Sequence, residues 1–393
     1  MTACAIEPAA ADEDRCPPAA GCVITVDGGY AARLAGEGDA LFPERWTLDG
    51  PAPYAVPLPA HQPEERGTEV HPLADGRVLI RRSAAGRHSF SLLYPTGPGT
   101  GELLLGAVDY PAGDRLRLLP PAPGGERAYA LAAGHDSSTV WLVAGGAFGP
   151  ERVAEIPGRC SGGVWLDRAG RMLALDRESE GRTKAVVVDL ERGGAVSPLL
   201  QIADASDDRV LLADPDSGLL LVASDAPSPG EVRLGWGVVG STLPVRFPEC
   251  LRLPGHAVTP FAIQPAQVLT PEGCAVALRL DGPFGSRVGV WRPAERQMHQ
   301  LPAPEGWLAG AGRWTPQGVL LLPYATPEEP CGVARWEVPA AVAAPAEPGA
   351  SPETAPTAVS AAGPAAGPVG PAEPVAPRPV PLQEAPLGRL VTK

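Results

Sequence analysis

Short apolar runs alternate with polar turns along this chain, and one such pair recurs over most of its length. In each copy a polar turn ending in glycine is closely followed by an apolar run. The turn glycines are Gly29, Gly76, Gly125, Gly170, Gly218, Gly273 and Gly318, at intervals of 47, 49, 45, 48, 55 and 45 residues. Periods of about 40–50 residues built from short strands are typical of propeller blades. The pattern therefore predicts an all-β, seven-bladed propeller.

A second landmark keeps the same phase. Five of the eight tryptophans follow the glycine of their own copy at almost the same spacing, namely Trp46, Trp141, Trp236, Trp291 and Trp336. In the other two copies Tyr94 and Val188 occupy the equivalent places. The regular spacing predicts a third strand in every blade, with a large apolar side chain that packs between neighbouring sheets.

Each copy divides into four antiparallel strands. The first leads into the glycine turn and the second leaves it, as at 164–166 and 172–175. The third carries the tryptophan, as at 288–291, and a short fourth strand follows, as at 152–156. The second strands are nearly all apolar, which indicates that adjacent sheets cover both of their faces. An irregular β-sandwich with chance spacing is the alternative.

The seventh copy, at about residues 305–338, shows no fourth strand. Propellers often close their ring by pairing strands from opposite ends of the chain. We expect the segment 4–7 to supply the missing outer strand, with 341–344 as the alternative. In blade five, the long interval between Gly218 and Gly273 indicates an inserted loop or a displaced boundary.

The predicted propeller domain spans residues 1–338, and the remaining residues, 339–393, have a different composition. They are dominated by alanine and proline and contain no aromatic residue. Such a segment cannot bury enough apolar surface to offset its conformational entropy. We therefore expect a disordered C-terminal tail.

Charge and hydropathy exclude several classes of partner. The net charge of −13 disfavours nucleic-acid binding, which needs clustered lysine and arginine. No apolar run approaches the roughly 20 residues that span a bilayer, and no secretory signal is visible. We expect a soluble, cytoplasmic, monomeric protein. Its only lysines are Lys184 and Lys393, and this arginine bias indicates GC-rich coding rather than mechanism.

The seven cysteines are odd in number and widely scattered. In a reducing compartment free buried thiols are the default, and Cys274 is expected to be a small core residue of a second strand. Cys4, Cys16 and Cys22 lie near one another in the sequence, but without a CxxC pair or a companion histidine they make a poor metal site.

The common catalytic and cofactor motifs are missing. Gly-x-Ser-x-Gly is absent, and neither lysine stands in a phosphate-binding loop. Residues 235–240 match GxGxxG, but they fall on a predicted third strand with no helix to follow, so no dinucleotide site is expected.

The densest acidic cluster comprises Asp204, Asp207, Asp208, Asp214 and Asp216. A calcium-loop register fails, because Gly218 stands where a fifth-position ligand is needed. A turn-forming Asp-Pro-Asp-Ser-Gly sequence at a blade tip explains the same residues.

The histidines are His61, His71, His88, His135, His256 and His299, and they show no HxH or HxxxH pair. His135, Asp136 and Ser137 are adjacent, and contiguity argues against a triad because neighbouring side chains point in different directions. A composite site would need the ring to bring several histidines to one rim. We assign no catalytic, metal or cofactor-binding residue and expect no cofactor.

The turns at 315–318, 270–273 and 73–76, each followed by an apolar strand, resemble the Ser-Pro-Asp-Gly turn of TolB-type, WD40-like propeller repeats. The resemblance covers about residues 20–338. The same repeats form the propeller half of prolyl-oligopeptidase-family enzymes, whose catalytic domain has no counterpart here. The resemblance implies a propeller and does not carry over the peptidase activity.

These observations favour a non-catalytic interaction scaffold whose partner is another protein. One alternative is a propeller enzyme or small-molecule binder that uses the mouth of the central channel. Several carboxylates or histidines close together at one end of the channel would favour it. Another is an accessory propeller of a separately encoded hydrolase.

Overall fold

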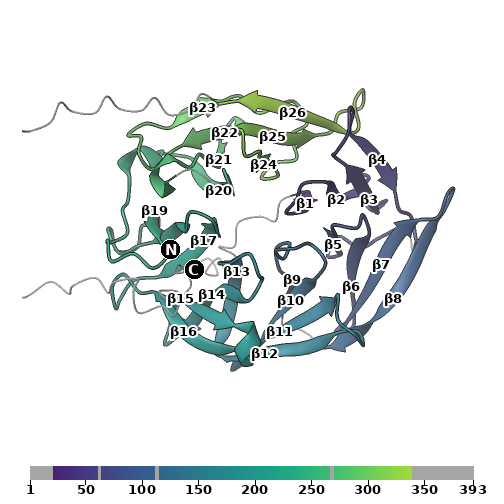
Figure 1. Cartoon of the computed structure of the whole chain (residues 1–393), viewed down its shortest axis with the longest axis horizontal. Coiled ribbons are helices and arrows are strands. Elements are labelled where there is room, and N and C mark those ends of the chain that lie inside the picture. Colours follow the sequence, from purple (N-terminus) through teal and green to yellow (C-terminus); the bar gives the residue numbers. More distant parts are fainter. Residues whose placement is uncertain (1–20, 61–62, 111–114, 266–269, 339–393) are drawn as a thin grey trace, which may run out of the picture.

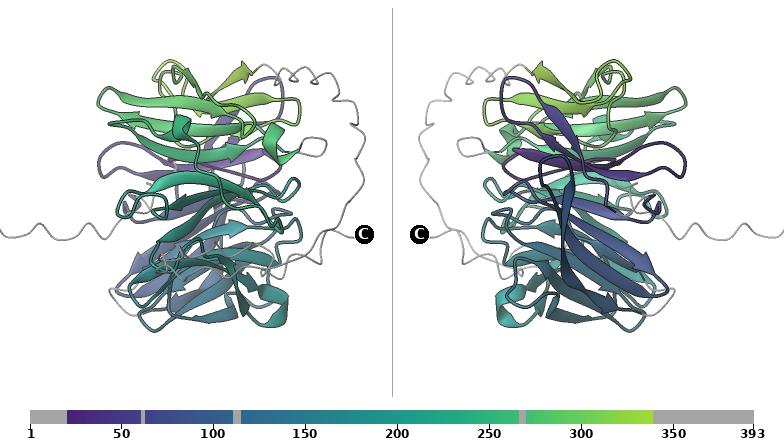
Figure 2. Two further views of the ribbon diagram at one scale, coloured as in Figure 1. Left: turned by 90° about the vertical axis from the view of Figure 1, so that its left-hand side faces the viewer. Right: turned by 90° about the vertical axis from the view of Figure 1, so that its right-hand side faces the viewer.

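The computed structural model describes residues 21–60, 63–110, 115–265 and 270–338. Its strands form seven antiparallel sheets, arranged as the blades of one ring (Figure 1). Seen from the side, the strands run between the two faces of the ring (Figure 2). The prediction of an all-β, seven-bladed propeller is confirmed.

The first three blades each contain four strands, with the inner strand first. Blade one comprises β1 (Val23–Ile24), β2 (Tyr30–Ala35), β3 (Phe42–Thr47) and β4 (Tyr54–Pro57). Blade two comprises β5 (Glu69–Pro72), β6 (Val78–Ala84), β7 (Arg87–Pro95) and β8 (Thr100–Asp109). Blade three comprises β9 (Arg115–Leu118), β10 (Ala128–Ala133), β11 (Ser137–Ala144) and β12 (Glu151–Pro157).

The other four blades follow the same order. Blade four comprises β13 (Arg159–Trp165), β14 (Met172–Ser179), β15 (Arg182–Asp189) and β16 (Ala195–Leu200). Blade five comprises β17 (Asp208–Ala213), β18 (Leu219–Ser224) and β19 (Arg233–Val238). Blade six comprises β20 (Ala257–Ile263), β21 (Val276–Gly282), β22 (Gly285–Trp291) and β23 (His299–Leu301), and blade seven β24 (Arg313–Trp314), β25 (Val319–Tyr324) and β26 (Gly332–Glu337).

Helical structure is limited to three short 3-10 turns in the described residues: η1 (Leu190–Arg192), η2 (Glu249–Leu251) and η3 (Pro271–Gly273). No helix in this part of the chain has the length and apolar character needed to cross a membrane.

The apolar core lies between the blades. Seven clusters of buried residues fill the seven interfaces between adjacent sheets, the last being that between blades seven and one. On β14, Leu173 and Leu175 pack against blade three, while Met172 and Ala174 pack against blade five. This alternation explains why the second strands are apolar on both faces, as the sequence predicted.

The five tryptophans of the repeat all lie on third strands, as predicted. Trp46, Trp236 and Trp291 are buried, and Val188 is buried in the equivalent place on β15. Tyr94 differs, because 37% of it is exposed. It lies beyond the last pair that β7 forms with β6, so the second strand of its own sheet does not extend beside it.

The prediction of four strands in every blade is wrong for blade five, whose described residues form only three strands. In place of the fourth strand, Arg246 forms an isolated bridge with Trp236 through two backbone hydrogen bonds of 2.8 and 2.9 Å. The next hydrogen-bonding positions along such a strand are Pro244 and Pro248, which have no amide hydrogen to donate. The long interval in this blade therefore holds the irregular connection from β19 to β20.

Blade seven has three strands in the described residues. Both segments expected to complete it, 4–7 and 341–344, lie outside those residues, as does the whole of the tail, 339–393. Blades seven and one are in contact through an apolar cluster, in which Cys331 and Ala311 pack with Trp46. Nη1 of Arg313 also donates to the carbonyl of Asp27 at 2.5 Å.

The described cysteines are free thiols, as expected: Cys22, Cys160, Cys250, Cys274 and Cys331. Cys274 is fully buried, although it lies just before β21 rather than within it. Burial raises the pKa of its thiol to about 11. Cys4 and Cys16 lie outside the described residues.

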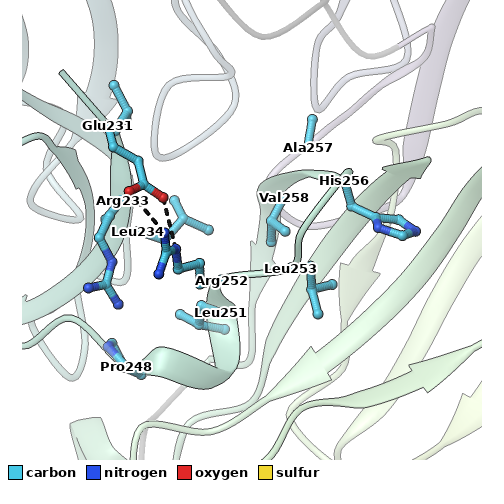
Figure 3. Close-up of a pocket in the computed structure, with 11 residues that line it drawn as sticks. Glu231, Arg233, Leu234, Pro248, Leu251, Arg252, Leu253, His256, Ala257 and Val258 are labelled. Carbon is cyan, nitrogen blue, oxygen red and sulfur yellow. Dashed lines mark hydrogen bonds and ion pairs between the residues drawn. The ribbon is translucent and has the colours of Figure 1, made fainter. Parts of the chain in front are cut away.

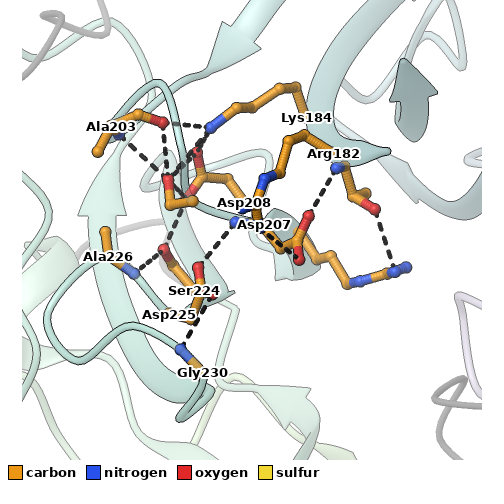
Figure 4. Close-up of polar contacts among 12 residues, drawn as sticks. Arg182, Lys184, Ala203, Asp207, Asp208, Ser224, Asp225, Ala226 and Gly230 are labelled. Carbon is orange, nitrogen blue, oxygen red and sulfur yellow. Dashed lines mark hydrogen bonds and ion pairs between the residues drawn. The ribbon is translucent and has the colours of Figure 1, made fainter. Parts of the chain in front are cut away.

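A buried ion pair joins blades four and five. Lys184 on β15 reaches Asp208 on β17, with Nζ 2.8 Å from Oδ2, and Asp208 is fully buried (Figure 4). Ser206 and Ser224 donate further hydrogen bonds to the same carboxylate at 2.9 and 2.6 Å. Because every oxygen of Asp208 is bonded, the charge is compensated inside the protein.

Replacing Lys184 by methionine should lower the free energy of unfolding by about 3 kcal/mol, because it leaves Asp208 as an unpaired buried charge. The measurement is urea unfolding monitored by tryptophan fluorescence. The matched control is Arg152→Met, which breaks the exposed pair of Arg152 with Glu155 and should change stability by less than about 1 kcal/mol. Equal effects of the two substitutions would show that the pair is not a structural anchor.

Candidate functional site

A large cavity, the central channel, lies at the centre of the ring in the described residues. Its volume is about 1550 Å³, and residues from all seven blades line it. Because the apolar faces of the sheets are covered by neighbouring blades, the inner strands turn their remaining side chains toward this channel. The channel is therefore the place where side chains from distant repeats meet.

Arginine dominates the charged residues of the channel wall. The seven arginines are Arg33, Arg66, Arg115, Arg117, Arg159, Arg209 and Arg279. The four carboxylates are Glu69, Asp176, Glu178 and Asp207. Arginines therefore outnumber carboxylates on the wall by seven to four, in a chain whose net charge is −13. Two of these arginines, Arg33 and Arg66, form ion pairs with Glu44 and Asp39, which do not line the channel. GC-rich coding explains an arginine bias but not this clustering, which the sequence alone did not predict.

The sheet register places one residue of five successive inner strands at the same level of the channel. In each of these blades, the amide of the residue after the inner strand donates a hydrogen bond to a carbonyl near the start of the second strand. The second-strand residue four positions after that carbonyl is the partner of the inner-strand residue at this level. These five residues, here called the polar layer, are Glu69, Arg115, Ser161, Arg209 and Thr259. Their second-strand partners are Arg81, Ala133, Asp176, Ala223 and Arg279.

At this level of the channel, Glu69 and Arg279 each form an ion pair with an oppositely charged side chain. Glu69 accepts a hydrogen bond from Nε of Arg81 at 2.9 Å and another from the amide of Leu118 at 2.7 Å. Arg279 donates from Nε to Asp281 at 2.8 Å. These contacts fix side chains on blades two and six and add no net charge to the channel.

Asp176 is the buried acid beside the polar layer. It continues the alternation of Met172 and Ala174 on β14, so it faces blade five, where Oδ1 accepts the amide of Val210 at 3.0 Å. Burial raises the pKa of Asp176 to about 7, against the opposing effects of that amide and of Arg209 and Arg117. Its charge therefore changes near neutral pH.

A glycine bulge in β13 makes room for this acid. Gly162 has a φ of +73°, and a Cβ atom there would lie 2.7 Å from Oδ2 of Asp176. The register of β13 against β14 shifts at this point. The carbonyl of Gly162 also accepts a hydrogen bond from Nη2 of Arg117. One glycine therefore shapes the surroundings of both side chains.

Arg209 lies on the channel wall at the junction of blades four and five. Nη1 donates to Oγ of Ser161 at 3.3 Å, and Nη2 donates to Oγ1 of Thr183 at 3.2 Å. Both partners are neutral, and no carboxylate of the described residues forms an ion pair with this guanidinium. Arg159, exposed on the same wall, likewise has no ion pair with a described residue.

The described histidines lie on different elements and do not form one site. His71 lies on β5, His88 on β7 and His299 on β23, while His135 and His256 are in connections. Burial lowers the pKa of His71 to about 4. No three histidine, cysteine or carboxylate side chains are grouped as a metal site in the described ranges. His61 lies outside them.

The acidic cluster of the sequence separates in space. Asp214 accepts hydrogen bonds within its own turn, as the turn interpretation predicted. Asp216 pairs with Arg168 of blade four. Asp207 accepts the amide of Thr183 at 2.7 Å, and Asp208 belongs to the buried pair described above. Asp204 lies 3.4 Å from Nε2 of Gln201.

The two remaining motifs have structural explanations. His135 and Asp136 are almost fully exposed in the turn between β10 and β11, and Ser137 begins β11. The first part of the GxGxxG match, 235–238, belongs to β19, as expected. Neither location assembles a catalytic or nucleotide-binding arrangement.

A smaller cavity of about 220 Å³ lies between β19 and β20. Glu231 and Arg252 face each other there, at 2.8 and 3.1 Å, while His256 points away (Figure 3). Arg233 pairs with Glu249 at 2.6 Å. Because these charges are already matched, the cavity offers a ligand much less than the channel does.

No protein-family model and no curated protein sequence matches the chain. Among solved structures, a puromycin-hydrolysing peptidase of Mycobacterium tuberculosis is 17% identical with a TM-score of 0.49, over 80% of this chain and 51% of that one. TolB of Acinetobacter baumannii is 13% identical with a TM-score of 0.41, over 78% and 82%. Chaetomium thermophilum Sqt1, bound to the N-terminus of ribosomal protein L10, is 13% identical with a TM-score of 0.41, over 80% and 84%.

These likenesses bear on the fold alone. The chain spans about half the length of the mycobacterial peptidase. It is a seven-bladed propeller that resembles TolB and the propeller domain of prolyl-oligopeptidase-family enzymes by structure only.

Stability should fall as pH rises from about 4 to about 7, because over this range Asp176 is ionised in the unfolded chain but still protonated in the folded protein, where its pKa is about 7. The full loss should be about 4 kcal/mol, since each pKa unit corresponds to about 1.36 kcal/mol, and Asp176→Asn should remove it. Urea unfolding of both proteins across the range measures it. Burial lowers the pKa of His71, so this histidine makes stability rise with pH in both proteins. Subtracting one stability curve from the other removes that contribution. Identical pH dependence in both proteins would contradict the assignment.

Proposed function

We propose that the protein is a non-catalytic binding module that recognises a protein partner by taking a negatively charged segment of it into the central channel. The observation that carries this proposal is the charge of the channel wall, where arginines outnumber carboxylates in an otherwise acidic chain. Opposite charges attract most strongly in a recess with low-dielectric walls, which focus the local field.

The size of the channel supports a polypeptide ligand. Its volume of about 1550 Å³ exceeds the roughly 300–1000 Å³ of ordinary small-molecule pockets. An extended segment can contact side chains from several blades at once, whereas a compact ligand touches few of them. A chain segment therefore uses more of the available wall.

The chemistry of the wall supports binding over catalysis. Arginine remains protonated at physiological pH and acts only as a hydrogen-bond donor, so it does not serve as a general base. Its planar guanidinium is well suited to recognising carboxylates. The monomeric state and the cytoplasmic location expected from the sequence remain predictions.

A labelled Glu/Gly peptide should bind the full chain, whereas Gln/Gly and Lys/Gly peptides of equal length should not. Fluorescence anisotropy measures the affinities, and added salt should weaken the Glu/Gly complex because it screens the channel charges. Arg159→Ala should weaken binding about threefold. The matched control is Arg335→Ala on β26, since Arg335 is exposed and does not line the channel.

Two results would contradict the proposal. The first is a Gln/Gly peptide that binds as tightly as the Glu/Gly peptide, since charge would then play no part. The second is an equal effect of the two arginine substitutions, because the interaction would then depend on overall charge and not on the channel.

A further inference from the structure

We infer that Arg209 is the anchor of a carboxylate-binding site in the channel wall, between blades four and five. For a carboxylate carried by a protein partner, this inference rests on the proposed function. For a free small carboxylate it stands without it.

Arg209 is held in place by groups that leave its charge uncompensated. Its two terminal nitrogens bond to the hydroxyls of Ser161 and Thr183, which belong to blade four. Hydroxyl groups orient a guanidinium but carry no charge. Because Arg209 itself comes from β17 of blade five, blades four and five have to pack together for the side chain to take this position.

The two aspartates that precede Arg209 in the sequence, and Asp176 on the neighbouring blade, have other partners. Asp207 accepts the amide of Thr183 through Oδ1, and Asp208 is bonded to Lys184. Asp176 accepts the amide of Val210 through Oδ1. None of them is within ion-pair distance of Arg209 in the described residues, so its attraction for an external anion remains available.

The charge of the site favours a carboxylate over a phosphate. A single unpaired guanidinium matches the single negative charge and the planar shape of a carboxylate, to which it can donate two hydrogen bonds. Asp176 supplies a negative charge at the same wall when it is ionised. That charge disfavours a phosphate group, which concentrates its second negative charge beside Asp176, more than a dicarboxylate such as glutarate, whose two charges lie on separate groups.

Asp176 also makes the site sensitive to pH. The charged groups that act on this carboxyl are Arg209 from β17 and Arg117 from β9, and the thiol of Cys160 on β13 lies close enough to be influenced by it. When Asp176 loses its proton, the positive field at Arg209 weakens. Carboxylate binding should therefore weaken as pH rises through about 7.

The experiment measures binding of three probes to the full chain: the Glu/Gly peptide by anisotropy, and glutarate and inorganic phosphate by calorimetry. The variant is Arg209→Gln, with Arg335→Gln as the matched control for charge. Arg209→Gln should weaken binding of the peptide and of glutarate about tenfold. The control variant should bind like the unchanged protein, and phosphate should bind more weakly than glutarate.

A second variant keeps the test independent of any folding defect in Arg209→Gln. In the unchanged protein, affinity for glutarate should fall between about pH 6 and about pH 8, whereas Asp176→Asn should show the same affinity at both. An equal fall in both proteins would overturn the role of Asp176 and, with it, the placement of the ligand beside Arg209.

The outcomes separate the two proposals. If the peptide binds and Arg209→Gln leaves its affinity unchanged, the site is wrong and the proposed function stands. If glutarate binds in an Arg209-dependent way and the peptide does not, the site stands and the protein-partner proposal fails. Phosphate binding as tight as that of glutarate would overturn the carboxylate assignment, and a lack of binding by all three probes would overturn both.

Discussion

Burial of the second and third strands between adjacent sheets is the constraint on which the rest of this structure depends. No blade has a core of its own, since each apolar cluster is shared by two neighbouring blades. The hydrophobic contribution, about 25 cal/mol per Å² of apolar surface buried, is therefore obtained only when the blades stand side by side. Ring order and blade stability are consequences of the same packing.

This arrangement frees the channel for polar residues. The apolar side chains of β14 are divided between the interfaces with blades three and five, and the inner strand β13 presents Ser161 to the channel. A charged side chain there keeps contact with water and does not disturb the core. The channel can therefore hold several arginines, and pairs such as Glu69 with Arg81 limit their mutual repulsion.

The sequence allowed the fold to be predicted because its signals are local. The turn glycines recur in every repeat and the third-strand tryptophans in five of the seven, and each marks a strand that the structure contains. Blade five departs from the pattern for an equally local reason, since Pro244 and Pro248 cannot donate the hydrogen bonds of a fourth strand. Both prolines are visible in the sequence, so the loss of the fourth strand could be predicted from it.

The candidate site could not be predicted in the same way, because its residues come from different repeats. Arg209, Ser161 and Asp176 are separated by up to 48 residues and meet only through the register of β13 with β14 and the packing of blade five against blade four. Each looks ordinary in its own repeat. The arginine excess was visible in the composition, but only closure of the ring shows that seven of these residues face one channel.

The junction of blades four and five links the stability of the ring to the chemistry of its channel. Asp208, next to Arg209 on β17, is bonded to Lys184 inside the interface, so the backbone that carries the guanidinium is fixed from the buried side. On the channel side, Asp176 is buried at a cost that grows when it ionises, and Gly162 leaves it the space to be there. A buried acid with a raised pKa destabilises the ring at higher pH, and the same charge weakens the positive field of Arg209. Folding and anion binding at this junction should therefore respond to pH in the same direction, because one carboxyl group contributes to both.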